Sequence, residues 1–437
     1  MRIFYNAILL ACALVLCINT AALSQKMMEK LGRGVVAINQ GGGKIYVGWR
    51  LLGTDPANLA FNLYRTTGKK AAVKLNKTPV TATTNYIDQL TDTTASASYF
   101  VKEVLNGNEG NASTTYTLPA NSAGKPYLSV PLQTMAGYKP NDASVGDLDG
   151  DGEYEIVIHQ VGRGRDNSQS GITTEPILEA YKLNGTLLWR INLGRNIREG
   201  AHYTQFMVYD LDGDGKAEVA CKTADGTIDG TGKVIGDSTK TWRNQNGHIL
   251  RGPEYLTVFN GLTGAAINTT AYVPTIHPAT LEPTTDQIKH IWGDGYGNRG
   301  MRFLAGIAYL DGKHPSLIMC RGYYTRTVIV AWDLEKGLLK QRWMFDSDAS
   351  PKTRLYRGQG NHNLSIADVD GDGKDEIVYG AMTLDDNGRV YIPPALAMPM
   401  PCTYRTSTLT APVWKFLIYR NTLVMPEPIS GMHARAR

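Results

Sequence analysis

The stretch Asp147-Leu-Asp-Gly-Asp-Gly-Glu-Tyr-Glu155 sets the pattern of this chain; it recurs as Asp210-Leu-Asp-Gly-Asp-Gly-Lys-Ala-Glu218 and Asp368-Val-Asp-Gly-Asp-Gly-Lys-Asp-Glu376. Alternating aspartates on a tight loop aim their oxygens at one centre, and glycine lets the backbone turn without a Cβ clash. An all-oxygen set favours Ca²⁺ over softer metals. We therefore predict three calcium loops whose ligands are Asp147, Asp149, Asp151 and Glu155; Asp210, Asp212, Asp214 and Glu218; and Asp368, Asp370, Asp372 and Glu376.

The residues that flank these loops are typical of strands. An EF-hand loop closes on a glutamate at its twelfth position and lies between two helices, whereas the glutamate here stands ninth. Ala143-Ser-Val-Gly146 precedes the first loop, and Glu155-Ile-Val-Ile-His159 follows from its last residue. Each loop is therefore predicted to join two strands, and its ion to stabilise the fold that holds it.

The bulk composition favours a large, exported, all-β protein. A chain of 437 residues is too long for one compact core, so two or more domains are expected. Charged residues make up 19%, and the net charge of +5 is scattered. The absence of a basic stripe argues against nucleic acid as a partner.

The first 24 residues are typical of a signal peptide. Arg2 supplies the positive end, Ile8–Ile18 the apolar stretch and Ala22-Leu-Ser24 a cleavage site. The apolar stretch is short for a membrane span, and Leu9–Cys12 lies too early in it for a good lipoprotein signal. We expect a secreted or periplasmic protein, where abundant Ca²⁺ fills even weak sites.

The cysteines do not form a disulfide framework. Cys12 and Cys17 belong to the predicted signal peptide, which leaves Cys221, Cys320 and Cys402. Cys221 and Cys320 lie in apolar strand-like runs, so buried thiols are expected there.

Residues 26–130 have the alternation of a β-sandwich. Lys44–Trp49, Phe61–Tyr64 and Tyr99–Val104 are short alternating runs separated by turn-rich stretches. An early tryptophan and a late tyrosine resemble a fibronectin type III-like module. We find no catalytic constellation in it and predict a supporting role.

Residues 131–388 contain the acidic loops and predict part of a β-propeller. The first two loops start 63 residues apart, at 147 and 210, and the third starts 158 residues later, at 368. Equal spacing would favour a solenoid, whereas uneven spacing favours propeller blades with long, variable loops.

The segment 389–437 departs from the rest of the chain. It holds one acidic residue, Glu427, against 39 in the preceding 388, yet it is too rich in apolar residues for a disordered tail. Back-translation read one base earlier permits a further D-L-D-P-D loop followed by M-E-V-F. We therefore interpret this tail as aberrant and out of frame, and we expect the chain as it stands to be an inactive, truncated form.

Several segments, taken in order, resemble one enzyme family. They are Leu183–Gly194, Gly200–Met207, Lys222–Thr227, Arg302–Gly312, Arg321–Tyr324 and Gly358–Asn363. Together they resemble rhamnogalacturonan lyases of polysaccharide lyase family 11, over roughly residues 30–388. The resemblance implies a small β-sandwich followed by a calcium-rich propeller, eight-bladed in the family and incomplete here. It also implies cleavage of the rhamnose-(1→4)-galacturonate bond of rhamnogalacturonan I by β-elimination, by a monomer that uses Ca²⁺.

The family's functional residues carry over in part. Asn141 matches a substrate-contacting asparagine, and His362 matches a histidine that helps hold a cleft calcium. The partner of that histidine survives here only in the shifted frame. Met301 departs from the family's usual acidic residue. His202 and Arg321 lie in matching segments without an assigned role, and no catalytic base is identified.

Two other functions stay open at this point. One is a non-catalytic calcium propeller that binds glycans or proteins, although such a propeller would not need the Gly-Asn-His-Asn segment at 360–363. The other is a glycoside hydrolase, which requires two carboxylates about 5–10 Å apart facing one sugar. Most of the paired acidic residues are already assigned as calcium ligands, which disfavours the hydrolase.

Overall fold

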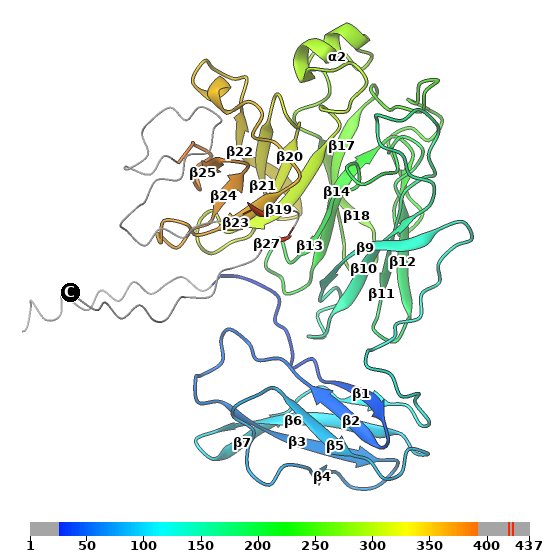
Figure 1. Ribbon diagram of the computed structural model, residues 1–437, viewed down its shortest axis with the longest axis vertical. Coiled ribbons are helices and arrows are strands. Elements are labelled where there is room, and N and C mark those ends of the chain that lie inside the picture. Colours follow the sequence, from blue (N-terminus) through cyan, green and yellow to red (C-terminus); the bar gives the residue numbers. More distant parts are fainter. Residues whose placement is uncertain (1–25, 392–417, 420–421, 424–437) are drawn as a thin grey trace, which may run out of the picture. The chain divides into compact units, whose positions relative to one another are not determined.

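The computed structural model describes residues 26–391, together with the backbone of 418–419 and 422–423 (Figure 1). The predicted signal peptide, residues 1–24, and most of the tail 389–437 lie outside the described residues. Within them the chain is built almost wholly from antiparallel strands, which confirms the all-β prediction. The last two strands, β26 (Ile418–Tyr419) and β27 (Thr422–Leu423), pair with each other.

Two sheets at the N-terminal end enclose one core. The first consists of β1 (Val36–Gly41), β2 (Lys44–Gly48) and β5 (Asn85–Gln89). The second consists of β4 (Val73–Lys74), β3 (Ala60–Thr67), β6 (Ala97–Leu105) and β7 (Asn108–Ala112), with β8 (Tyr116–Leu118) also paired to β6. Successive side chains of a strand point to opposite faces, so Ala97, Tyr99 and Val101 of β6 are buried while the residues between them are half-buried.

Four more sheets follow in chain order. The first contains β9 (Lys139–Gly146), β10 (Glu155–Val161), β11 (Ile177–Tyr181) and β12 (Leu187–Asn192), extended by β15 (Thr227–Ile228) and β16 (Val234–Ile235). The second contains β13 (Phe206–Tyr209), β14 (Glu218–Ala224), β17 (Glu254–Phe259) and β18 (Ala266–Ala271). The third contains β19 (Phe303–Ala308), β20 (Ser316–Arg321), β21 (Val328–Glu335) and β22 (Leu338–Asp346). The fourth contains β23 (Leu364–Ala367), β24 (Glu376–Tyr379) and β25 (Met382–Leu384).

Neighbouring sheets in this series share their cores. Val219 and Cys221 of β14 pack against the first sheet, whereas Ala220 between them packs toward the third. In β20, Leu317 faces the second sheet and Ile318 the fourth. Strands buried on both faces favour consecutive apolar residues, and Val219–Cys221 of β14 and Leu317–Cys320 of β20 are such runs. Both of these cysteines are buried free thiols, as predicted.

The helices are short. The helix α2 (Thr285–Trp292) begins with a capping box between Thr284 and Gln287 and ends at Gly293, whose φ of 88° suits glycine. It buries Ile288 and Trp292 against the sheets. A 3₁₀ turn, η1 (Thr353–Tyr356), precedes the fourth sheet.

Each acidic loop joins the first two strands of a sheet. The loops connect β9 to β10, β13 to β14 and β23 to β24, which confirms the strand prediction. In the third sheet the equivalent connection contains Asp311, which pairs with His314. This connection lacks the other acidic residues of the repeat. The long interval before the third acidic loop therefore holds a complete sheet with a reduced loop. The first strands of successive sheets lie beside one another, but within residues 26–391 the series does not close into a ring.

Candidate functional site

The first acidic loop is held by hydrogen bonds to its own backbone. Asp147 Oδ1 accepts from the amide of Gly150 at 2.7 Å, and its Oδ2 accepts from Gly152 at 2.8 Å. Glu155 Oε2 accepts from the amide of Leu148 at 2.9 Å. The first aspartate and the closing glutamate thus fix the turn by hydrogen bonds to the backbone. They also supply oxygens that could bind a metal ion.

The other two loops repeat this geometry. Asp210 accepts from Gly213 and Gly215 at 2.7 and 3.0 Å, and Asp368 accepts from Gly371 and Gly373 at the same two distances. Both glycines of each loop have φ near 80–90°, a conformation in which a side chain would be strained. The repeated sequence therefore gives a repeated structure.

Each loop brings three carboxylates to one point. Oxygens of the first aspartate, the second aspartate and the glutamate lie within 4.8 Å of one another, in the groups Asp147, Asp149 and Glu155; Asp210, Asp212 and Glu218; and Asp368, Asp370 and Glu376. The third aspartates, Asp151, Asp214 and Asp372, are not in these groups and accept from the amide two residues further on.

Burial makes these carboxylates costly to ionise. This burial, together with the neighbouring aspartates, raises the pKa of Glu155 and Glu376 to about 7 and that of Glu218 to about 8. Glu376 Oε1 is buried and has no hydrogen-bond partner among the described residues. A hard cation would neutralise the charge and satisfy this oxygen, so the three groups are chemically suited to hold one.

A lysine from a neighbouring turn reaches into the first loop. Lys182 of the β11–β12 turn forms an ion pair with Asp149 at 2.5 Å and lies 3.3 Å from Asp151. The hydrogen bond to Asp149 raises the pKa of Lys182. This side chain offsets part of the negative charge of the first loop.

A cavity of about 990 Å³ opens beside the ends of β9 and β10. Asn141, the predicted substrate residue, lines it from β9, and its Nδ2 donates to Asp142 at 3.0 Å. The segments 163–169 and 199–207 form other walls. The structure therefore places Asn141 at the mouth of a hollow large enough for a few sugar units.

A buried histidine–glutamate pair lines the same cavity. His159 Nε2 lies 3.1 Å from Glu199 Oε2, and both side chains are almost inaccessible. Glu199 Oε1 has no hydrogen-bond partner within the described residues. Such a pair can share a proton and can present a free carboxylate oxygen to a ligand.

His202 lies at another edge of the cavity, among charged and aromatic groups. Its Nε2 is 3.9 Å from Asp166 Oδ2, and Asp166 is also paired with Arg302 at 3.0 Å. Burial and, second, the charge of Arg302 lower the pKa of His202 to about 4, so the ring is neutral at physiological pH.

His362 stands next to His202, with ring centroids 5.3 Å apart, and its Nε2 lies 2.5 Å from the hydroxyl of Tyr324. It is exposed and is not one of the loop carboxylate groups. The histidine expected to share a calcium with it survives only in the shifted reading frame, so the role of His362 as a metal ligand stays a prediction.

Arg321 belongs to a buried ionic cluster. Its Nη1 pairs with Glu254 Oε2 at 2.8 Å, and Lys222 Nζ lies 3.2 Å from the other oxygen of Glu254. Burial alone would raise the pKa of Glu254, but Arg321 and Lys222 reverse this and lower it. Met301, at the position where an acid was expected, places its Sδ 3.1 Å from Arg321 Nη2.

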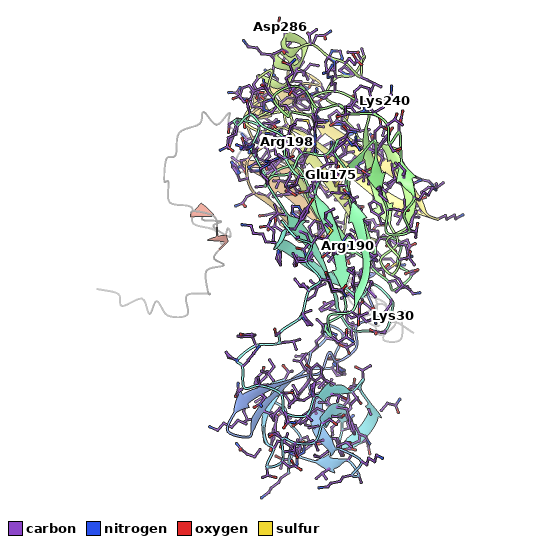
Figure 2. The ribbon with its side chains drawn as sticks, turned by 90° about the vertical axis from the view of Figure 1, so that its right-hand side faces the viewer. Lys30, Glu175, Arg190, Arg198, Lys240 and Asp286 are labelled. Atoms are coloured by element: carbon purple, nitrogen blue, oxygen red, sulfur yellow. The ribbon has the colours of Figure 1, made fainter. Side chains whose placement is uncertain are left out.

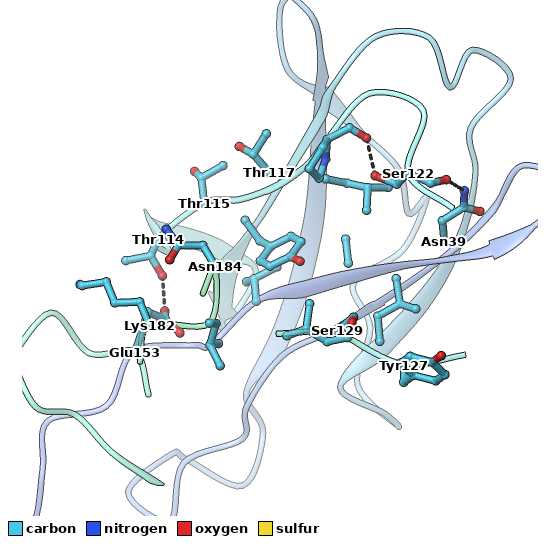
Figure 3. A pocket seen from close by; sticks show the side chains of 18 of the residues that line it. Asn39, Thr114, Thr115, Thr117, Ser122, Tyr127, Ser129, Glu153, Lys182 and Asn184 are labelled. Atoms are coloured by element: carbon cyan, nitrogen blue, oxygen red, sulfur yellow. Dashed lines mark hydrogen bonds between the residues drawn. The ribbon is translucent and has the colours of Figure 1, made fainter. Parts of the chain in front are cut away.

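A second cavity, of about 790 Å³, lies between β8 and the first acidic loop (Figure 3). Hydroxyl and amide side chains such as Thr115, Thr117 and Asn184 line it, and Thr114 donates to Glu153. It contains none of the predicted substrate residues.

The cationic residues of the larger cavity are not among the site residues predicted from the sequence. Arg163 and Arg165 line it together with Asp166. The run Gly162-Arg-Gly-Arg-Asp166 was a usable signal, because glycines between arginines indicate a turn that carries exposed charge.

Comparisons with known proteins identify the class. The model of the rhamnogalacturonan lyase family 11 C-terminal domain matches residues 128–397, and that of the rhamnogalacturonan I lyase beta-sheet domain matches residues 26–118. The chain therefore belongs to rhamnogalacturonan lyase family 11.

Two curated relatives come from Bacillus subtilis (strain 168). The rhamnogalacturonan endolyase YesW is 52% identical over 393 residues, which cover 87% of this chain and 60% of the relative. The exolyase YesX is 52% identical over 375 residues, which cover 83% of this chain and 58% of the relative. The chain thus spans about 60% of the length of these relatives, and they do not favour the non-catalytic alternative.

Solved structures agree. A rhamnogalacturonan lyase from Bacillus licheniformis has a TM-score of 0.75 at 54% identity, over 84% of this chain and 60% of its own. The structure of YesX gives the same TM-score at 51% identity, over 84% of this chain and 59% of its own. In the described part of this chain, no helix is long and apolar enough to cross a membrane.

Proposed function

We propose that this protein acts on rhamnogalacturonan I as a lyase and cleaves rhamnose-(1→4)-galacturonate bonds by calcium-assisted β-elimination. The observation that carries the proposal is the cavity of about 990 Å³ at Asn141, in a chain that belongs to the lyase family. Export across a membrane, action as a monomer and a pectic polysaccharide as the substrate are parts of the same proposal.

The chemistry of elimination suits this cavity. A galacturonate carries its carboxylate beside the C5 proton that must leave, so positive charge near the carboxylate stabilises the enolate-like transition state. Bound Ca²⁺ would supply such charge in the cleft and would neutralise the acidic loops that support it. Asn141 offers an amide to the sugar, and the walls offer both cationic groups and the free Glu199 oxygen.

The architecture belongs to the proposal as well. We infer that the two N-terminal sheets form a fibronectin type III-like sandwich and that the four later sheets are blades of a propeller, eight-bladed in the complete form. Shared cores between successive sheets and adjacent first strands support this. In a propeller, loops between the first and second strands of all blades open on one end.

Ultraviolet absorbance of the products distinguishes the reaction. Only elimination creates a double bond conjugated with the carboxylate, whereas hydrolysis produces reducing ends without new absorbance. The assay uses rhamnogalacturonan I with Ca²⁺, for the 437-residue protein and for the protein encoded when one base is corrected at Gly388–Arg389. We expect unsaturated products from the corrected protein, and their absence from both proteins would sink the proposed function.

A further inference from the structure

The larger cavity contains cationic side chains without ionic partners. Lys139, Arg163 and Arg165 all line it. Across residues 26–391, none of the three forms an ion pair with a carboxylate. Unpaired cations that converge on one hollow favour an anionic ligand.

The carboxylates of the same walls already have partners. Asp166 pairs with Arg302 at 3.0 Å, and Glu199 lies 3.1 Å from His159. Asp142 accepts a hydrogen bond from Asn141. Glu199 Oε1 has no partner within the described residues and Asp142 is met only by a neutral amide, so the cavity contains both signs of charge, and the three cations are the groups that can pair with an incoming carboxylate.

A buried arginine holds the loop that carries Arg163 and Arg165. Arg198, labelled in Figure 2, donates to the carbonyls of Arg165 at 3.2 Å, Asp166 at 3.2 Å and Gln169 at 2.8 Å. The amide of Arg165 also donates to the carbonyl of Glu199 at 3.0 Å. A loop fixed at several points loses little freedom when a ligand binds, so its charges are preorganised.

The Arg165 side chain has a buried hydrogen-bond donor without an acceptor. Its Nε is buried and has no hydrogen-bond partner among the described residues. A Cβ on Gly171 would lie 2.8 Å from this nitrogen, so the end of the Arg165 side chain packs against this glycine. A buried donor without an acceptor is costly, and a ligand oxygen would remove that cost.

We propose that Arg165, assisted by Arg163, is the anchor that binds a uronate carboxylate of the substrate in this cavity. A planar guanidinium matches the two oxygens of a carboxylate in a way that a neutral sugar hydroxyl cannot. The assignment rests on the proposed function for its substrate class. It adds specificity-determining residues, which bind and orient the sugar without taking part in proton transfer.

The test measures binding to the 437-residue protein by calorimetry, with rhamnogalacturonan oligosaccharides and the same oligosaccharides after reduction of their carboxylates to alcohols. We expect the native ligand to bind about tenfold or more tightly than the reduced one. Arg165→Gln should weaken binding of the native ligand by a similar factor and leave binding of the reduced ligand unchanged. Arg163→Gln should have a smaller effect in the same direction.

Matched variants control for fold and for charge. Arg165→Lys keeps the charge and should recover part of the affinity, whereas the exposed Arg354→Gln, outside the cavity, should change nothing. Thermal unfolding of each variant checks that it is folded. If Arg165→Gln does not fold, two other measurements test the anchor. They are the affinity of Arg163→Gln and the ratio of the affinities of the unsubstituted protein for the native and the reduced ligand.

The outcomes separate the anchor from the proposed function. Equal affinity for native and reduced ligands, or unchanged affinity in folded Arg165→Gln and Arg163→Gln, would overturn the anchor alone, since lyase activity can persist with other contacts. Failure of both the unsubstituted 437-residue protein and the protein corrected at Gly388–Arg389 to bind either ligand would overturn both the anchor and the proposed substrate class.

Discussion

At the scale of single residues, this protein uses its charged side chains first to build structure. Asp210 closes its loop through two backbone amides before any ion is considered. Arg321 is completely buried and neutralises Glu254 inside the sheets. Its place in a family segment therefore reflects packing, and its charge is not available to a ligand.

Replacement of Asp210 by alanine should destabilise the protein strongly in saturating Ca²⁺. The change removes an ion ligand and leaves the amides of Gly213 and Gly215 without acceptors, for a loss of about 2–4 kcal/mol. Denaturant unfolding measures it. Asp286→Ala on the exposed face of α2 is the matched control (Figure 2). Identical unfolding of Asp210→Ala and the unsubstituted protein would show that this loop is no metal site.

Arg321→Met should cost about 3–5 kcal/mol, because it leaves Glu254 with only Lys222 as a buried counter-charge. Met approximates the length of the arginine stem but removes the guanidinium from the ring of Trp292 and from the carbonyls of Gly300 and Pro274, so the loss reports these contacts together with the charge. The exposed Arg354→Met serves as the control. A loss below about 1 kcal/mol, the range of exposed ion pairs, would contradict the interpretation.

At the scale of elements, the acidic loops are turns under electrostatic strain. Three of the four later sheets carry one between their first two strands, and each concentrates three carboxylates within 4.8 Å. The strand that follows each loop, β10, β14 or β24, is mostly buried, whereas β13 and β23 before their loops are partly buried and β9 is largely exposed. Loss of the loop structure is therefore expected to destabilise the sheet whose first two strands the loop joins.

Chelation should lower the melting temperature by well over a few degrees. An ion at 100 times its dissociation constant stabilises the folded state by about 2.7 kcal/mol for each site. Calorimetry with Ca²⁺ and with excess EDTA measures the difference, and re-addition of Ca²⁺ should restore it. An unchanged transition in EDTA would rule out structural ions.

In EDTA, stability should fall as pH rises from about 6.5 to 8. The pKa of Glu155 and Glu376 is about 7 in the folded state and that of Glu218 is about 8, against an ordinary value of 4.5. The folded state therefore binds more protons over this window, and its advantage is lost as those protons leave. His202, with its pKa lowered to about 4, has the opposite effect only below its ordinary value of 6.5.

Saturating Ca²⁺ should remove this pH dependence, because the ion holds the carboxylates in their charged form. Denaturant unfolding at several pH values, with and without Ca²⁺, provides the comparison. A free energy of unfolding that rises from pH 6.5 to 8 in EDTA would contradict the account.

At the scale of the whole molecule, the question is how far the series of sheets extends. Four sheets follow one another with shared cores, and within the described residues their ends do not meet. A sheet face or edge without a neighbour is an aggregation hazard. The predicted shifted reading of 389–437 permits another acidic loop at the point where we expect a further sheet to begin.

Correction of one base at Gly388–Arg389 should therefore give a more soluble and more stable protein, and lyase activity should appear only in that form. The two proteins are compared by melting temperature and by release of unsaturated products, and the gene is resequenced at this codon. Equal activity of the 437-residue protein would show that the tail is genuine. A stop codon directly after the correction would contradict the shift.

The sequence by itself determined the strand–loop–strand units, because an acidic turn and period-two apolar residues are local patterns that need no distant partner. It also identified the family and the two buried cysteines. It could not show that Asp151, Asp214 and Asp372 turn to the backbone, or that Lys182 enters the first loop, since these depend on side-chain packing between strands. Tertiary structure alone brought Arg165 beside Asn141 and placed His202 next to His362. His202 and His362 precede different sheets and meet because the sheets stack, whereas the pairing of β9 with β10 within one sheet brings Asn141 and Arg165 to the same cavity.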